Sequence, residues 1–87
     1  MDDVLAHFSA TAVPVEGSCE TLDVRELPPP RPLKETLERL AAMEGSGLLV
    51  QVNDRVPQHL FPRIEDRGYE HQTVEGEDAV LTAIWPE

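Results

Sequence analysis

One segment, residues 26–32, limits what this 87-residue chain can fold into more than any other. It contains four of the chain's eight prolines. Because proline fixes φ and has no backbone N–H, this segment cannot pair within a sheet and has to form a stiff, exposed connection. Its last proline, Pro32, suits the first turn of a helix, where a missing N–H costs nothing. We therefore expect a strand before this segment and a helix after it.

The hydrophobic pattern predicts six elements in the order β-α-β-α-β-β. Strand patterns are found at residues 21–24, 48–52, 69–74 and 79–85. One helix is expected from Pro32 to about Glu44, where glycines follow. Asn53 and Asp54 supply oxygens suited to cap a second helix. Pro62 predicts that this second helix is kinked or starts late.

Polarity predicts how the strands are arranged. The two most apolar strands, at residues 48–52 and 79–85, are expected in the centre of the sheet and the other two at its edges. Strands joined through a helix are expected to be parallel, and the final hairpin antiparallel. The predicted fold is an α/β two-layer sandwich, with a mixed four-stranded sheet and two helices on one face.

The first part of the chain has a different character. Residues 1–20 show no clean hydrophobic period, so we expect a flexible N-terminal extension before a folded domain at residues 21–87. The alternative is an arm whose Leu5 and Phe8 dock on the domain or on a partner. The acidic start and the lack of a long apolar stretch predict a cytoplasmic protein without a signal peptide or membrane span.

Charge and cysteine content narrow the function classes. With 7 basic and 17 acidic side chains the net charge is −10, which argues against nucleic acid as a partner. Many acids with a single lysine are typical of a halophilic protein that stays hydrated in high salt. Cys19 is the sole cysteine, so an internal disulfide and a multi-cysteine metal site are excluded.

One motif resembles a known family. Residues 22–33 read Leu-Asp-Val-Arg-Glu-Leu-Pro-Pro-Pro-Arg-Pro-Leu. This resembles the opening motif of the TusA/SirA sulfur-carrier family, Leu-Asp-hydrophobic-Arg-Gly-Leu-x-Cys-Pro-x-Pro. The resemblance covers about residues 21–86 and implies the same β-α-β-α-β-β sandwich. Glu26 stands where the family has glycine, and Pro29 where it has the sulfur-carrying cysteine.

The triple proline is closer to an uncharacterised TusA-like branch, a domain of unknown function whose members lack the cysteine. Residues 52–54, Val-Asn-Asp, followed by Pro57 are also similar to that branch. The resemblance also implies a context, since members of that branch can accompany hemerythrin-like domains or nitrogen-oxide metabolism genes. Because proline has no nucleophile, a persulfide relay at Pro29 is excluded. Cys19 precedes the first predicted strand, whereas Pro29 follows it. Cys19 therefore lies at the opposite end of that strand from the position of the carrier cysteine and cannot replace it.

Candidate binding residues lie where the first two predicted strands end. Parallel strands finish at the same edge, so two helix N-termini are expected to converge there. Backbone N–H groups and guanidinium groups at this edge suit an anion or an acidic partner segment. The alternative is that the arginines only balance nearby carboxylates. The candidate residues are Arg25, Pro29, Arg31, Asn53 and Arg55.

Catalytic and metal-binding patterns are missing from the sequence. The three histidines, His7, His59 and His71, have no metal-binding spacing, and the acidic residues 75–78 lack the alternating ligands of a calcium loop. We therefore expect a non-catalytic binding or regulatory module without metal or cofactor, which binds a protein partner or a small anion as a monomer or weak dimer. Alternatives are a sulfur-trafficking accessory without the carrier thiol, and a redox accessory of nitrogen-oxide or iron metabolism that uses the histidines.

The net charge of −10 predicts that salt stabilises the fold. Repulsion among the carboxylates is screened as the Debye length falls from about 10 Å at 0.1 M to about 3 Å at 1 M salt. We expect the thermal melting midpoint to rise between 0.1 M and 1 M sodium chloride. A flat or falling midpoint would contradict the halophilic interpretation.

Overall fold

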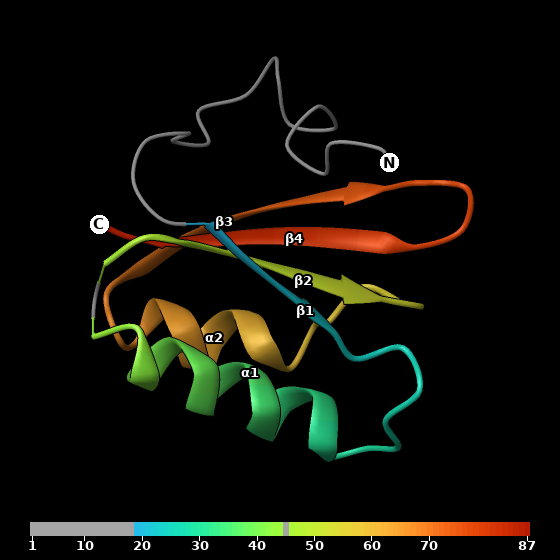
Figure 1. Ribbon diagram of the computed structural model, residues 1–87, viewed down its shortest axis with the longest axis horizontal. Helices are drawn as coiled ribbons and strands as arrows, with labels where there is room; N and C mark the ends of the chain where they lie inside the picture. Colours follow the sequence, from blue (N-terminus) through green and yellow to red (C-terminus); the bar gives the residue numbers. More distant parts are fainter. Residues whose placement is uncertain (1–18, 45) are drawn as a thin grey trace.

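The computed structural model describes residues 19–44 and 46–87 (Figure 1). The elements are β1 (Cys19–Asp23), α1 (Arg31–Ala42), β2 (Leu48–Asn53), α2 (Leu60–Glu65), β3 (Tyr69–Glu75) and β4 (Val80–Pro86). The predicted order β-α-β-α-β-β is therefore confirmed. The first strand begins two residues earlier than predicted, at Cys19. The expected extension and its docking alternative otherwise fall on residues 1–18, which lie outside the described residues.

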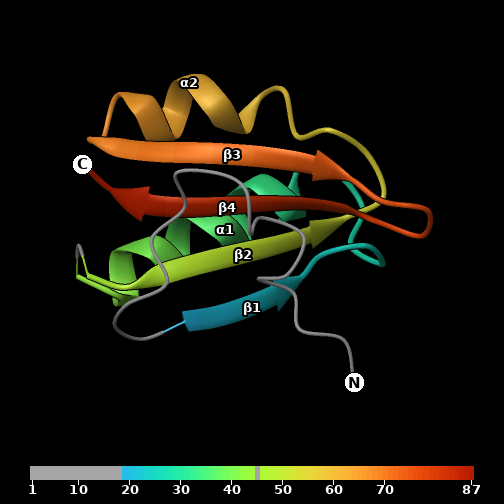
Figure 2. The same ribbon diagram turned by 90° about the horizontal axis from the view of Figure 1, so that it is seen from above.

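The sheet has the strand order β1-β2-β4-β3, which places the two most apolar strands in the centre as predicted (Figure 2). Strands β1 and β2 are parallel, whereas β4 is antiparallel to both of its neighbours. Consequently β1, β2 and β3 all end at one edge of the sheet (Figure 2). Both helices cover one face of the sheet, so the predicted two-layer sandwich is confirmed (Figure 1).

The core between the helices and the sheet is built from aliphatic side chains. Leu49 and Ile84 of the central strands are fully buried there, and Leu60 and Ile64 of α2 pack against them. Burying a side chain of this size contributes about 1.5–3 kcal/mol to the free energy of unfolding. A second apolar cluster lies on the other side of the same strands; its buried members are Leu48, Val50, Val52, Leu81 and Ala83. Every residue of β2 is buried.

Helix α2 starts late. This is one of the two outcomes predicted from Pro62, the other being a kink. It begins at Leu60, so Pro62 lies in its first turn, where no backbone hydrogen bond is lost. The prediction that Asn53 and Asp54 cap this helix is wrong. The N-cap is His59, which makes no side-chain capping bond, and residues 54–59 form a loop. No helix in the described part of the chain is long and apolar enough to cross a membrane.

Helix α1 ends two residues before a residue with an unusual backbone conformation. Its C-cap is Met43, and the next residue, Glu44, has a φ of 55°. The backbone N–H of Glu44 donates to the carbonyl of Ala41 at 3.2 Å, which closes the helix end. A left-handed residue at this position is usually glycine, because a side chain there costs about 1–2 kcal/mol.

This conformation predicts that Glu44→Gly stabilises the protein by about 1 kcal/mol, since glycine removes the clash of Cβ with the backbone. The matched control is Glu38→Gly, which removes the same charge from the exposed middle of α1. It should destabilise the protein by about 0.5–1 kcal/mol. Urea unfolding of both variants measures the difference, and a loss of stability in Glu44→Gly would contradict the prediction.

Candidate functional site

The edge of the sheet at which β1, β2 and β3 end carries a pocket of about 840 Å³. Three segments form its walls: the proline-rich connection before α1, the loop between β2 and α2, and the β3–β4 hairpin. The lining residues are Leu27, Pro29, Pro30, Pro32, Leu33, Asn53, Asp54, Arg55, Val56, Gln58, His59, Glu75 and Val80. We call this the rim pocket.

The proline-rich wall of the rim pocket is held by turns at both of its ends. The N–H of Leu27 donates to the carbonyl of Val24 at 3.1 Å, and the N–H of Arg31 donates to that of Pro28 at 2.9 Å. Val24 is itself fully buried and anchors the start of the connection. The peptide bond between Pro29 and Pro30 is cis. Because proline restricts φ, the wall loses little conformational entropy when a ligand binds.

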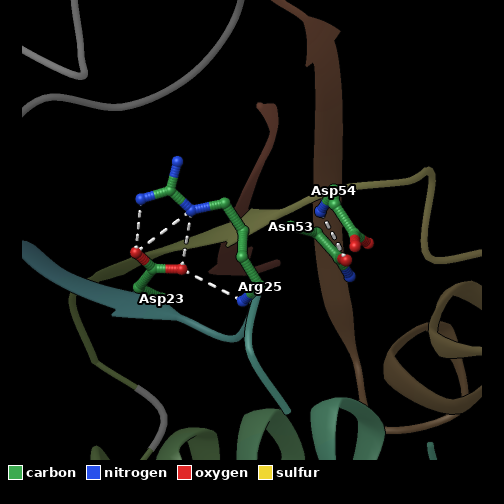
Figure 3. Close-up of polar contacts among 4 residues, drawn as sticks. All are labelled: Asp23, Arg25, Asn53 and Asp54. Carbon is green, nitrogen blue, oxygen red and sulfur yellow. Dashed lines mark hydrogen bonds and ion pairs between the residues drawn. The ribbon is translucent and has the colours of Figure 1, made fainter. Parts of the chain in front are cut away.

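A chain of buried and half-buried hydrogen bonds joins this wall to the opposite loop. The Thr36 hydroxyl donates to the Pro32 carbonyl at 2.7 Å and accepts a bond from Gln51 Nε2 at 2.8 Å. The side-chain oxygen Oε1 of Gln51 accepts from Asn53 Nδ2 at 3.2 Å. Asn53 Oδ1 in turn accepts from the backbone N–H of Asp54 at 2.7 Å (Figure 3). The side chains therefore connect the first turn of α1, the centre of β2 and the loop after β2.

Arg25 has a local structural role. Its guanidinium lies against the Asp23 carboxylate, with Nε to Oδ1 at 3.0 Å and Nη2 to Oδ2 at 2.7 Å (Figure 3). The backbone N–H of Arg25 also donates to Asp23 Oδ1 at 3.0 Å. These hydrogen bonds lower the pKa of the Asp23 carboxyl below its ordinary value. The contact between Asp23 and Arg25 thus shapes the turn after β1, and Arg25 does not line the rim pocket.

The other two candidate arginines also have carboxylate partners. Arg31 lies 3.7 Å from Glu35, four residues along α1, and is outside the pocket lining. Arg55 lines the pocket but contacts its neighbour Asp54 at 3.2 Å. Because α2 starts only at Leu60, the expectation that Arg55 lies at a helix N-terminus is wrong. Exposed pairs of this kind contribute little to stability.

The structure brings together three of the five candidate residues. Pro29, Asn53 and Arg55 line the pocket, whereas Arg25 and Arg31 do not. Sequence reasoning missed most of the remaining lining, above all its apolar residues Leu27, Val56 and Val80 and its polar residues His59 and Glu75. The hairpin residues carry no local signal, because only the strand order brings them beside the loop after β2.

The remaining candidates for chemistry lie apart. Cys19 is at the start of β1, the opposite end from Arg25, as predicted. His71 stacks on Phe61 and contacts Glu65 at 2.8 Å, away from His59 in the rim pocket. His7 lies outside the described residues. Within residues 19–44 and 46–87, no group of three or more His, Cys, Asp or Glu residues is placed to hold a metal ion.

Of the comparisons with known proteins, the one with protein-family models gives a match. A family model described as an uncharacterized conserved protein (DUF2249) matches residues 21–85. The matched range runs from within β1 to within β4, so it includes both helices and all three walls of the rim pocket. Neither a curated protein nor a solved structure matches the chain.

The buried hydrogen bonds predict that Thr36→Val destabilises the protein by about 1–3 kcal/mol, although valine has almost the same shape. The reason is that Gln51 Nε2 and the Pro32 carbonyl both lose a partner. Thr21→Val, at an exposed position of β1, is the matched control and should change stability by less than about 0.5 kcal/mol. Urea unfolding measures both, and equal effects would show that the buried bonds contribute nothing.

Proposed function

The chain belongs to the family of uncharacterized conserved proteins DUF2249, and from that premise we propose that it is a non-catalytic binding module whose rim pocket holds an apolar segment of a protein partner. The observation that carries this proposal is the pocket itself. Its volume of about 840 Å³ falls within the range of about 300–1,000 Å³ that is usual for ligand sites. We further propose that the protein acts in the cytoplasm as a monomer or weak dimer, without nucleic acid, membrane or cofactor.

Preorganisation of the walls supports binding. One wall is built from three prolines, Pro29, Pro30 and Pro32, and the facing loop is held to it through the buried side chains of Gln51 and Asn53. A site that is already shaped loses less entropy on binding than one that has to be ordered. Apolar residues on three sides, Leu27, Leu33, Val56 and Val80 among them, supply the surface that an apolar segment would bury.

Charge favours a protein segment over a small anion. Two carboxylates, Asp54 and Glu75, line the pocket with a single guanidinium, that of Arg55, which is already paired with Asp54. An anion entering the pocket would meet more negative than positive charge. A segment with apolar side chains beside a basic residue fits this lining better, because its positive charge would lie near Glu75.

The chemistry of the lining supports a non-catalytic role. Among the described residues that line the pocket there is no Ser, Thr, Cys, Lys or Tyr to act as a nucleophile. His59 lines the pocket, but no carboxylate of the described residues is hydrogen-bonded to it. Activation of water by a histidine usually requires such an orienting partner.

A sulfur-trafficking or redox accessory is the second candidate function. It is favoured by Pro29, which stands where the similar TusA-like carriers have their cysteine and which lines the rim pocket. In this version the protein keeps the docking surface of a carrier and has lost the thiol. The partner would then be a protein of sulfur or nitrogen-oxide metabolism that recognises the carrier fold.

Photo-crosslinking in cells tests the proposal. A photoreactive amino acid at Gln58, which lines the pocket, should capture a defined partner, whereas the same group at exposed Glu70 of β3 should not. Adding Val56→Glu should reduce capture at Gln58 at least tenfold, because a charge would replace apolar surface. Cys19→Ser should leave capture unchanged.

Two results would contradict the proposal. Equal capture at Gln58 and Glu70 would show that the rim pocket has no partner of its own. Loss of capture in Cys19→Ser but not in Val56→Glu would point to a function of the thiol. Melting curves of each variant distinguish loss of binding from loss of folding. The identity of the captured protein then separates the two candidate functions.

A further inference from the structure

The seven basic residues of this chain fall into two groups. Four of them, Arg25, Arg31, Arg39 and Arg55, are each paired with a carboxylate. The other three have no ion pair with any residue that the structure describes, although acids outnumber bases by 17 to 7. These three are Lys34, Arg63 and Arg67.

All three of these cations line one groove on the helical layer. The groove has a volume of about 370 Å³ and lies between α1 and the C-terminal part of α2 with the turn that follows it. Its floor is apolar and comes from Leu33, Leu37 and Ala41 of α1, and among the described residues Glu38 is the only acidic one in its lining. Pro30 and Leu33 also border the rim pocket, but the cations and the rest of the floor belong to this groove alone.

We propose that this helical groove binds an acidic amphipathic helix of a partner protein. The proposal does not depend on the function proposed for the rim pocket. Charge complementarity carries it: three cations that pair with no described residue line an open groove in a chain of net charge −10. At physiological ionic strength the Debye length is about 8 Å, so the three nearby cations act on a bound carboxylate more strongly than distant acids do.

The shape of the floor suits a helix. Leu33, Leu37 and Ala41 are spaced at i, i+4 and i+8, and a rise of 1.5 Å per residue makes this row about 12 Å long. Two turns of a partner helix with apolar residues at the same spacing match this length. Leu33 and Leu37 are half-buried, so a partner helix would complete their burial.

The positions of the cations suit carboxylates on the flanks of such a helix. Lys34 borders the groove from α1, while Arg63 and Arg67 border it from the other side. A guanidinium group binds a carboxylate through two parallel hydrogen bonds, which orients the partner as well as attracting it. Because exposed ion pairs are weak singly, the apolar floor has to contribute part of the affinity.

Fluorescence anisotropy with a synthetic helical peptide tests the proposal. The probe carries Leu on one face and Glu on both flanks, and its matched control has Lys in place of every Glu. The wild-type protein should bind the Glu peptide saturably and the Lys peptide at least tenfold more weakly. Raising sodium chloride from 50 mM to 500 mM should weaken binding of the Glu peptide about tenfold.

Charge reversal locates the site. Arg63→Glu with Arg67→Glu should weaken binding of the Glu peptide at least tenfold. Arg31→Glu with Arg39→Glu changes the net charge equally, at residues outside the groove, and should weaken it less than threefold. Should the first pair fail to fold by circular dichroism, Arg63→Ala with Arg67→Ala should still weaken binding about fivefold.

Several results would overturn the proposal. They are the lack of saturable binding of the Glu peptide, equal binding of the Lys peptide, and equal losses in the two charge-reversed pairs. Amide chemical shifts of the wild-type protein give an independent readout. The peptide should shift the signals of Leu37 and Ala41 and leave those of the rim residues Val56 and Gln58 unchanged. Shifts confined to the rim would overturn the groove site while leaving the rim proposal standing.

Discussion

The buried amide of Gln51 is the constraint on which the rest of the structure depends. It lies fully buried in the central strand β2, where an unpaired amide would cost several kcal/mol. Its hydrogen bonds to Thr36 and Asn53 remove that cost, but only while α1 and the loop after β2 keep their present positions. Within the described residues no buried side-chain nitrogen or oxygen lacks a partner. The polar chain therefore determines how helix, strand and loop are placed relative to one another.

This placement separates two surfaces with different chemistry. The rim pocket has apolar walls and an excess of carboxylates, and its single arginine is already paired. The helical groove has an apolar floor and three cations that are not paired with any described residue. In a strongly acidic chain, the role of each basic residue depends mainly on whether a carboxylate pairs with it. An arginine beside an aspartate shapes a turn, as Arg25 does, whereas a group of unpaired cations is available to a ligand.

Much of the fold could be predicted from local patterns. The proline-rich connection, the apolar strands and the amphipathic stripe of α1 predicted the element order, the strand order and the two-layer arrangement, because the hydrophobic period and the polarity of each segment can be read locally. Errors occurred where a side chain had two possible partners. Asn53 was predicted to cap a helix, yet it bonds to Gln51 and to the N–H of Asp54. Arg55 was predicted at a helix start, yet Pro62 delays α2 to Leu60.

What the sequence by itself determined is the layout of the fold and the stiffness of its proline-rich connection, since both follow from φ restriction and hydrophobic period. Only the tertiary structure decided which pairs form between distant residues, which cations pair with no described residue, and which surfaces the charges border. Ion pairing depends on distances of a few ångströms between residues such as Arg39 and Glu20, which are far apart in the chain. The same holds for the groove, because Lys34 and Arg67 come together only when both helices pack on one face of the sheet.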